Sequence, residues 1–138
     1  MLSNTLETNE VKDASGSGVS LERMAIDNAS TVFKKIADDV ANPIRLTISH
    51  SHSGTGTTKV RRSLVRFDKT VTNSTTGAKG VSSAYVVLVS PEGVIENANN
   101  DTAVLAYLMS FLASLGASTT ILYDGTGNGA AALLSETL

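Results

Sequence analysis

Alternating apolar and polar residues predict three consecutive β-strands in the middle of the chain, over residues 43–53, 59–71 and 82–90. Successive strand side chains point to opposite faces, so every second residue shares a face. The apolar side of the first strand carries Ile44, Leu46, Ile48, His50 and His52. The third strand is apolar without interruption from Ala84 to Val89, as is typical of a strand that is covered on both faces.

The segments before these strands have less regular patterns. A turn cluster at residues 13–18 lies between segments 5–11 and 19–27, and this arrangement favours a β-hairpin. Within residues 30–40 the apolar side chains have helical spacing, whereas the run Thr31-Val32-Phe33 favours a strand. From the residues alone, both interpretations of that segment stay open.

The last long element is a predicted helix that begins at Asn100 or Asp101 and ends at Gly116. No charged residue occurs from Thr102 to Thr120, although a surface helix ordinarily has a charged face. A stripe of small residues at i, i+4 spacing consists of Thr102, Ala106, Ser110 and Ser114. We expect this helix to be buried on more than one side, most simply by another subunit; a weakly polar face in water is the alternative.

A short second helix is predicted to start at Ile121-Leu122-Tyr123 and to stop at Gly125–Gly129. Residues 130–138 would then form a C-terminal tail. The run Asp124–Gly129 superficially resembles a phosphate-binding loop, but it follows no predicted strand and precedes no long helix. We therefore assign that run to a turn.

Composition narrows the classes of function. The 138 residues have the length of one domain, and 41% of them are hydrophobic and 17% charged. The absence of cysteine excludes disulfides, thiol catalysis and Cys-based zinc sites. The segment Met1–Val11 lacks the apolar run of a signal peptide. The longest apolar stretch, Ala103–Ala117, is too short for a membrane span, so we expect no membrane partner.

Charge is segregated along the chain. Residues 41–80 contain one acidic residue, Asp68, and seven basic residues, Arg45, Lys59, Arg61, Arg62, Arg66, Lys69 and Lys79. The rest of the chain contains four basic and twelve acidic residues. This asymmetry suggests that one face meets a polyanion. The alternative is a pair of solvated strands whose charges have no partner.

Catalytic and metal-binding patterns are weak. His50 and His52 share a strand face and could supply two metal ligands, but a third is needed and Asp68 falls on the opposite side of its strand. No Ser, His and Asp occur in a recognisable nucleophile context. We expect no enzyme activity, no cofactor and no metal; a metal enzyme that uses the two histidines is a distant alternative.

The strongest functional signal is the polar side of the predicted strands. Arg62 and Arg66 supply positive charge for phosphates, and Thr47, Ser49 and Ser51 supply hydrogen bonds. Tyr85 on the neighbouring strand is suited to stack on an unpaired base. These residues together suggest RNA as the polyanion.

The order of elements resembles the coat protein of the single-stranded RNA bacteriophages, the levivirus type. The resemblance is best from Pro43 to Gly129. The segments that carry it are Arg45–His50, Val60–Asp68, Ser83–Pro91 and Asn99–Thr102. These are patterns of element order, and no catalytic signature is among them.

The resemblance implies an α+β fold with an N-terminal β-hairpin, an antiparallel sheet and two C-terminal helices that interlock in a dimer. One coat-protein domain would span residues 1–138. Its parts would be a hairpin region at 1–29, the sheet at 30–91, a helical region at 99–129 and the tail at 130–138. Residues 30–40 would form a strand, and the loop Thr72–Gly80 would make contacts at symmetry axes.

In function, the resemblance implies a capsid subunit that dimerises and builds an icosahedral shell around single-stranded genomic RNA. Some members of the family also bind an RNA hairpin and repress translation. The protein would be made in the bacterial host cytoplasm and would reside in the virion. The residues expected to face RNA are Arg45, Thr47, Ser49, Ser51, Arg62, Arg66 and Tyr85.

Two features depart from the family pattern. The N-terminal segment is acidic, and Leu64 and Val87 are apolar where the RNA face is usually polar. The departure at Leu64 and Val87 weakens the expectation of a specific hairpin more than that of a shell. The alternative function is a dimeric RNA-binding regulator that does not assemble further.

Overall fold

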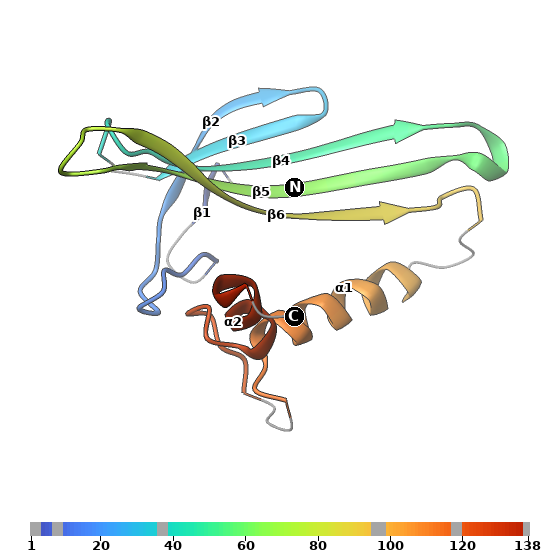
Figure 1. Ribbon diagram of the computed structural model, residues 1–138. Helices are drawn as coiled ribbons and strands as arrows, with labels where there is room; N and C mark the ends of the chain where they lie inside the picture. Colours follow the sequence, from blue (N-terminus) through green and yellow to red (C-terminus); the bar gives the residue numbers. More distant parts are fainter. Residues whose placement is uncertain (1–3, 7–9, 36–38, 95–98, 117–119, 137–138) are drawn as a thin grey trace. The chain divides into compact units, whose positions relative to one another are not determined.

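A computed structural model describes residues 4–6, 10–35, 39–94, 99–116 and 120–136. The chain divides into two compact units, the first made of residues 1–7 and 20–95 and the second of residues 8–19 and 96–138. The first unit contains a β-sheet, and the second contains the helices (Figure 1). That both units act as one coat-protein domain stays a prediction.

The sheet is a six-stranded antiparallel meander in which each strand pairs with its neighbours in sequence. Its strands are β1 (Thr5–Leu6), β2 (Leu21–Asp27), β3 (Ser30–Lys35), β4 (Ile44–Ser53), β5 (Val60–Thr72) and β6 (Lys79–Ser90). The strands expected at 43–53, 59–71 and 82–90 are confirmed as β4, β5 and β6. Strand β6 forms one edge of the sheet, and its long outer edge is visible in Figure 1.

The core of the first unit lies on one face of this sheet. The buried apolar side chains are Leu6, Leu21, Phe33 and Leu46. Phe33 pairs with Leu46 across β3 and β4, and Leu46 pairs with Phe67 across β4 and β5. The guanidinium of Arg23 lies 5.6 Å from the centre of the Phe33 ring. Alternate residues of neighbouring strands thus meet in one apolar layer.

The ambiguous segment at 30–40 is a strand from Ser30 to Lys35, and the helical interpretation is wrong there. Phe33 points into the core while Val32 pairs with Thr47 on the other face. Pairing with both β2 and β4 satisfies the backbone groups of β3, which outweighs the helical spacing of its apolar residues. Residues 36–38 lie outside the described part of the chain.

The sheet begins before residue 30, so the predicted boundary of the sheet is wrong. Strand β1 pairs with the start of β2, and β2 pairs with β3 along its length. In the second unit, the turn expected at 13–18 is confirmed: Asp13 Oδ1 accepts hydrogen bonds from the backbone N–H groups of Ser15 (2.9 Å) and Ser17 (3.0 Å).

The connection between β5 and β6 is shorter than the predicted loop Thr72–Gly80. Thr72 pairs with Lys79 and Val71 pairs with Gly80, which leaves residues 73–78 as the turn. Asn73 Oδ1 accepts hydrogen bonds from the backbone N–H groups of Thr75 and Thr76, both at 2.9 Å. The turn is therefore fully exposed but locally hydrogen-bonded.

Helix α1 spans Asn99–Ala113. It begins before the predicted caps Asn100 and Asp101, which lie in its first turn, and it ends before Gly116. The carbonyl of Ala113 accepts a hydrogen bond from Leu122 N (2.7 Å), and the carbonyl of Ser114 accepts one from Asn128 N (3.0 Å). The returning chain thus satisfies carbonyls at the end of the helix.

The second helix lies later in the chain than predicted. Helix α2 spans Asn128–Ser135, in the region expected to be a tail, whereas Ile121 forms an isolated bridge with Ser114. The helix instead begins within the expected stop Gly125–Gly129, at Asn128. Gly129 is buried against Phe111, and a Cβ atom there would lie 2.6 Å from ring carbons of Phe111. The close approach of the two helices requires glycine at this position.

The apolar residues of α1 are largely exposed in the single chain: Val104 is 60% exposed, Tyr107 74% and Phe111 61%. In the small-residue stripe, Thr102, Ala106 and Ser110 are exposed and Ser114 is half-buried. Within its own unit, the helix is thus not buried on more than one side. Its cover by another copy stays a prediction. Among the described residues, neither helix has the length and apolar character needed to span a membrane.

Candidate nucleic-acid interface

The strand register brings all seven residues expected to face RNA onto one side of the sheet, which we call the polar face. Residues directly opposite each other on antiparallel strands share a face. Four rows across β4, β5 and β6 therefore lie side by side. The rows are Arg45–Asp68–Ser83, Thr47–Arg66–Tyr85, Ser49–Leu64–Val87 and Ser51–Arg62–Val89. The role of these residues in RNA binding stays a prediction.

Two arginines on the polar face are available to an outside ligand. Arg45 and Arg62 are exposed, and neither forms a hydrogen bond or ion pair with another of the described residues. Lys34 on β3 pairs with Arg45 and belongs to the same face. The sequence patterns did not identify Lys34 as a site residue, because the structure of residues 30–40 was ambiguous.

Arg66 is already engaged with an acidic residue of its own strand. Arg66 Nε donates a hydrogen bond to Asp68 Oδ1 at 2.9 Å, and Arg66 Nη2 donates one to Ser83 Oγ at 3.2 Å. The hydroxyl of Ser83 in turn donates to Asp68 Oδ1. This hydrogen bond from Ser83, with help from Arg66, holds the pKa of Asp68 below its ordinary value. Asp68 is therefore a carboxylate at neutral pH.

These side chains surround an open depression of about 440 Å³ on the polar face. It is lined by Pro43, Arg45, Arg66, Asp68, Thr70, Val81 and Ser83. Sequence reasoning placed Arg66 and Asp68 on the same side of β5 but gave neither Asp68 nor Ser83 a role in RNA binding. The signal was present, because residues two apart on a strand share a face.

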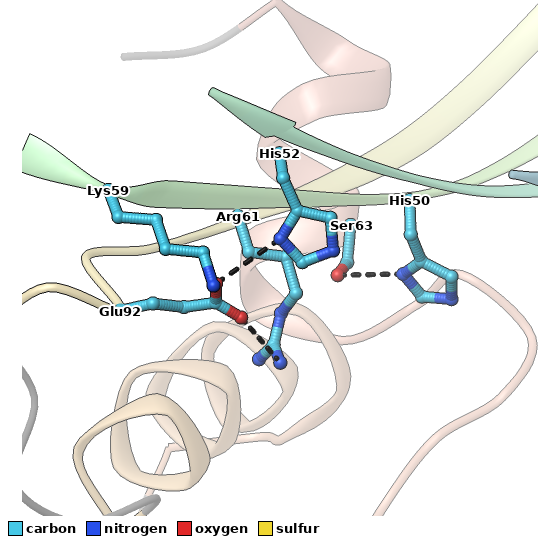
Figure 2. A network of polar contacts seen from close by, with 6 residues as sticks. All are labelled: His50, His52, Lys59, Arg61, Ser63 and Glu92. Atoms are coloured by element: carbon cyan, nitrogen blue, oxygen red, sulfur yellow. Dashed lines mark hydrogen bonds and ion pairs between the residues drawn. The ribbon is translucent and has the colours of Figure 1, made fainter. Parts of the chain in front are cut away.

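The opposite face of the sheet holds a second charged cluster, which is centred on Glu92 (Figure 2). The Glu92 carboxylate lies 3.2 Å from Lys59 Nζ, 3.4 Å from Arg61 Nη1 and 3.2 Å from His52 Nδ1. The hydrogen bond from Lys59 is the main cause that lowers the pKa of Glu92. Two of the seven basic residues in the middle of the chain are thus paired away from the polar face.

Both histidines lie on this same opposite face of the sheet, and only His52 contacts Glu92. His50 Nδ1 lies 2.9 Å from Ser63 Oγ, while His52 contacts Glu92 (Figure 2). No three His, Asp or Glu side chains of the described residues converge as a metal site would require.

Comparison with known proteins finds similar structures but no similar sequence. No protein-family model matches the chain, and no curated protein sequence matches it. The coat protein of bacteriophage EMS014 superposes with a TM-score of 0.73 at 12% identity, over 100% of this chain and 99% of that one. The virus-like particle of bacteriophage ESE020 gives 0.68 at 14% identity, over 100% and 99%. That of Beihai levi-like virus 21 gives 0.56 at 15% identity, over 87% and 98%.

This chain has the fold of the levi-like phage coat proteins. The predicted α+β class, with an antiparallel sheet followed by two C-terminal helices, is confirmed. At these identities the shared feature is the fold, so the polar face has to be argued from this chain's own residues. In this coat-protein fold, the candidate dimer residues Thr102, Ala106, Ser110 and Ser114 lie along α1 and just past its end.

Proposed function

We propose that the chain is a structural capsid subunit, which dimerises and assembles into a closed icosahedral shell around single-stranded RNA. The observation that carries this proposal is the coat-protein fold over the whole chain, at full length of both proteins compared. The role is structural and needs no catalytic step and no cofactor. Its place would be the virion, after synthesis in the bacterial host cytoplasm.

Dimerisation is supported by two exposed surfaces. The outer edge of β6 presents unpaired backbone groups along 12 residues, and such an edge readily pairs with another strand. Helix α1 exposes large apolar side chains and carries no charge after Asp101. A soluble protein rarely leaves so much apolar surface in water. A second copy that pairs along β6 and covers α1 would bury both surfaces.

A charge placed in the small-residue stripe tests the dimer. Ser110→Arg is expected to give monomers or aggregates, because an unpaired guanidinium in a covered contact is costly. Ser110 is exposed in the single chain, so the fold of one copy has room for the arginine. Analytical ultracentrifugation measures the outcome, with Ser53→Arg at the exposed end of β4 as control. Dimers of normal melting temperature from Ser110→Arg would contradict this role for α1.

RNA binding is supported by the charge on the polar face. Arg45 and Arg62 form no hydrogen bond or ion pair with the described residues, and phosphate contacts dominate the affinity of proteins for nucleic acids. The row Thr47–Arg66–Tyr85 combines a hydroxyl, a guanidinium and an aromatic ring, which together suit an unpaired loop base. Binding of one RNA hairpin through that row would make the subunit a translational repressor as well.

Purification of the expressed protein separates a shell subunit from a dimeric RNA-binding regulator. We expect particles in electron micrographs, with RNA that resists ribonuclease until the particles are opened. The Arg62→Ala, Arg66→Ala variant should form particles with less RNA, because about two phosphate contacts are lost. The affinity of this variant for RNA should also depend less on salt. The slope of log affinity against log salt concentration should fall by about 0.7 for each lost contact. If the protein forms only dimers under all assembly conditions, the shell role is refuted. The dimeric RNA-binding regulator is then the function that fits.

A further inference from the structure

The edge of the sheet opposite β6 is largely uncovered (Figure 1). Strand β1 pairs with only the first two residues of β2, and Arg23 N then donates a hydrogen bond to the Asn4 carbonyl at 2.9 Å. Beyond Arg23, none of the described residues pairs with the outer side of β2. Met24 is 63% exposed there and Ile26 65% exposed. Residues 24–27 therefore form an open edge with two large apolar side chains.

This open edge is suited to side-chain contacts and not to the addition of another strand. The register between β2 and β3 shifts between Arg23 and Ala25, so Met24 is an extra residue without a partner on β3. A bulge of this kind interrupts the ladder and protects an edge from further strand pairing. Ile26 is in register with Thr31, and both lie on the face opposite the polar face. A flexible methionine beside isoleucine gives an apolar surface that adapts to the shape of its neighbour.

The open edge ends in an acidic residue, Asp27, on the polar side of the sheet. Asp27 is in register with Ser30, and Ser30 with Ser49 of the polar face. Its Oδ1 accepts a hydrogen bond from Asn28 N at 2.7 Å, and it forms no ion pair with another of the described residues. The open edge is thus apolar on one face of the sheet and negative on the other.

The end of the β5–β6 hairpin has the complementary pattern. Val71 is 44% exposed, and its odd spacing from Asp68 places it on the face opposite the polar face. Lys79 pairs with Thr72 on the polar side and is exposed. Lys79 forms no hydrogen bond or ion pair with another of the described residues. The hairpin end is thus apolar on the face where the open edge is apolar, and positive where the open edge is negative.

The carboxylate nearest in effect to Lys79 within the chain is already satisfied. Asp39 accepts hydrogen bonds from Ala41 N at 2.9 Å and from Asn42 Nδ2 at 2.7 Å. These two hydrogen bonds, and to a lesser degree the charge of Lys79, lower the pKa of Asp39. The ammonium of Lys79 is therefore available to a carboxylate of another subunit.

We propose that the open edge of β2 receives the end of the β5–β6 hairpin from a subunit of a neighbouring dimer. Met24 and Ile26 then contact Val71, and Asp27 pairs with Lys79. The inference rests on the proposed shell function and adds the surface that receives this hairpin. Because every polar face of a closed shell points the same way, neighbouring subunits meet with like faces side by side. Apolar side chains then meet on one side of the sheet and opposite charges on the other.

Two other occupants fit the open edge less well. Contacts around the three-fold and five-fold axes of a shell are heterologous, so a surface there meets a different surface of the next subunit. A second β2 edge would also bring no cation to Asp27, because residues 24–27 contain no basic side chain. Helix α1 of the dimer partner is apolar, but its residues Asn99–Ala113 contain no lysine or arginine either. The charge of Asp27 favours the hairpin.

A charge exchange tests the pairing in RNA-free dimers that are reassembled into shells. Asp27→Lys and Lys79→Asp should each raise the dimer concentration needed for assembly by about fivefold, because an attraction becomes a repulsion. The variant with both changes restores the pair in reverse and should assemble like the wild type. Light scattering measures assembly, and analytical ultracentrifugation checks that each variant is still a dimer.

A second variant tests the apolar part of the contact. Ile26→Asp should raise the dimer concentration needed for assembly by about tenfold or more, because a buried apolar contact is lost. Ile26→Val keeps the apolar side chain and should assemble like the wild type. Ile26 is mostly exposed in the single chain, so both variants should keep the melting temperature of the dimer.

The outcomes separate this contact from the shell role itself. Normal assembly by all single variants, or no recovery in the double charge exchange, would overturn the contact while the shell role stands. Loss of the dimer in Ile26→Asp would also overturn it and would assign the open edge to α1 of the dimer partner. Wild-type dimers that never form shells would refute the shell role, and this inference with it.

Discussion

A carboxylate on a surface that faces a polyanion is costly unless it is held by nearby cations. Asp68 is held by the Arg66 guanidinium and by a hydrogen bond from the Ser83 hydroxyl, and it lies in the same row as Arg45. The ion pair between Arg66 and Asp68 competes with any phosphate for the Arg66 guanidinium. We therefore expect Asp68 to weaken RNA binding at this point of the polar face.

Asp68→Asn tests this competition, because asparagine keeps the size of the side chain and can still accept hydrogen bonds. The variant should bind RNA several-fold more tightly at low salt. The slope of log affinity against log salt concentration should be steeper by less than the ~0.7 of one full phosphate contact, because the existing contact to Arg66 is strengthened and no new contact is added. Filter binding across a salt series measures both quantities.

The control is Ser83→Ala, which removes the hydroxyl that donates to Asp68 but leaves the charge of the face unchanged. Its salt slope should equal that of the wild type. Weaker binding by Asp68→Asn would mean that the carboxylate positions Arg66 for RNA instead of competing for it.

At the scale of elements, the Glu92 cluster joins the start of β5 to the chain that leaves β6. Glu92 contacts Lys59 and Arg61 from the beginning of β5 and His52 from the end of β4 (Figure 2). Gly93 N donates a hydrogen bond to the Lys59 carbonyl at 3.0 Å. The cluster therefore ties this end of the sheet to the segment after β6.

Glu92→Gln should lower stability in a pH-dependent way. The pKa of Glu92 is depressed below its ordinary value of 4.5 in the folded state, chiefly by the hydrogen bond from Lys59. The folded protein thus binds this proton less readily than the unfolded one. The stabilisation is fully present above pH 4.5 and is lost as the pH falls through the depressed pKa.

Urea unfolding at neutral and at acidic pH measures this effect. The variant should be less stable than wild type near neutral pH, and the difference should shrink once the pH is well below 4.5. Glu22→Gln on the exposed face of β2 removes a carboxylate elsewhere and is the control. A stability difference that is the same at both pH values would show that Glu92 acts through its shape and not through its charge.

Elements with strict alternation were predictable from the sequence, and those that depend on distant pairing were not. Alternation along β4 and β5 assigns their side chains to two faces, so Thr47, Ser49 and Ser51 could be placed with Arg62 and Arg66 in advance. Glu92 could not be matched to Lys59, because their contact depends on how the strands pair and on the turn after β6. The position of α2 was predicted wrongly, because the large apolar residues Ile121-Leu122-Tyr123 indicate a buried helix start, whereas α2 forms from the Ala-rich run after Asn128, which has high helix propensity.

At the scale of the whole molecule, assembly needs surfaces that a single chain does not use for its own stability. The turn at residues 73–78 is such a surface. All six of its residues are exposed, and its side-chain hydrogen bonds stay within the turn. The resemblance to the phage coat proteins implies that this connection makes contacts at symmetry axes. We therefore expect it to govern assembly beyond the dimer.

Replacing residues 73–78 with Asn-Gly tests this expectation. Thr72 and Lys79 pair directly, and a two-residue turn of type I′ can join such a pair without shifting the strand register. The core residues Phe33 and Leu46 are untouched, so the dimer should fold and its melting temperature should change little. Closed shells of the original size should be absent, because the contact that joins dimers has been removed.

A six-residue turn of Gly and Ser in the same place separates the effect of length from that of sequence. Electron microscopy of both variants measures the result. Intact shells of the original size from the Asn-Gly variant would show that assembly does not need this turn.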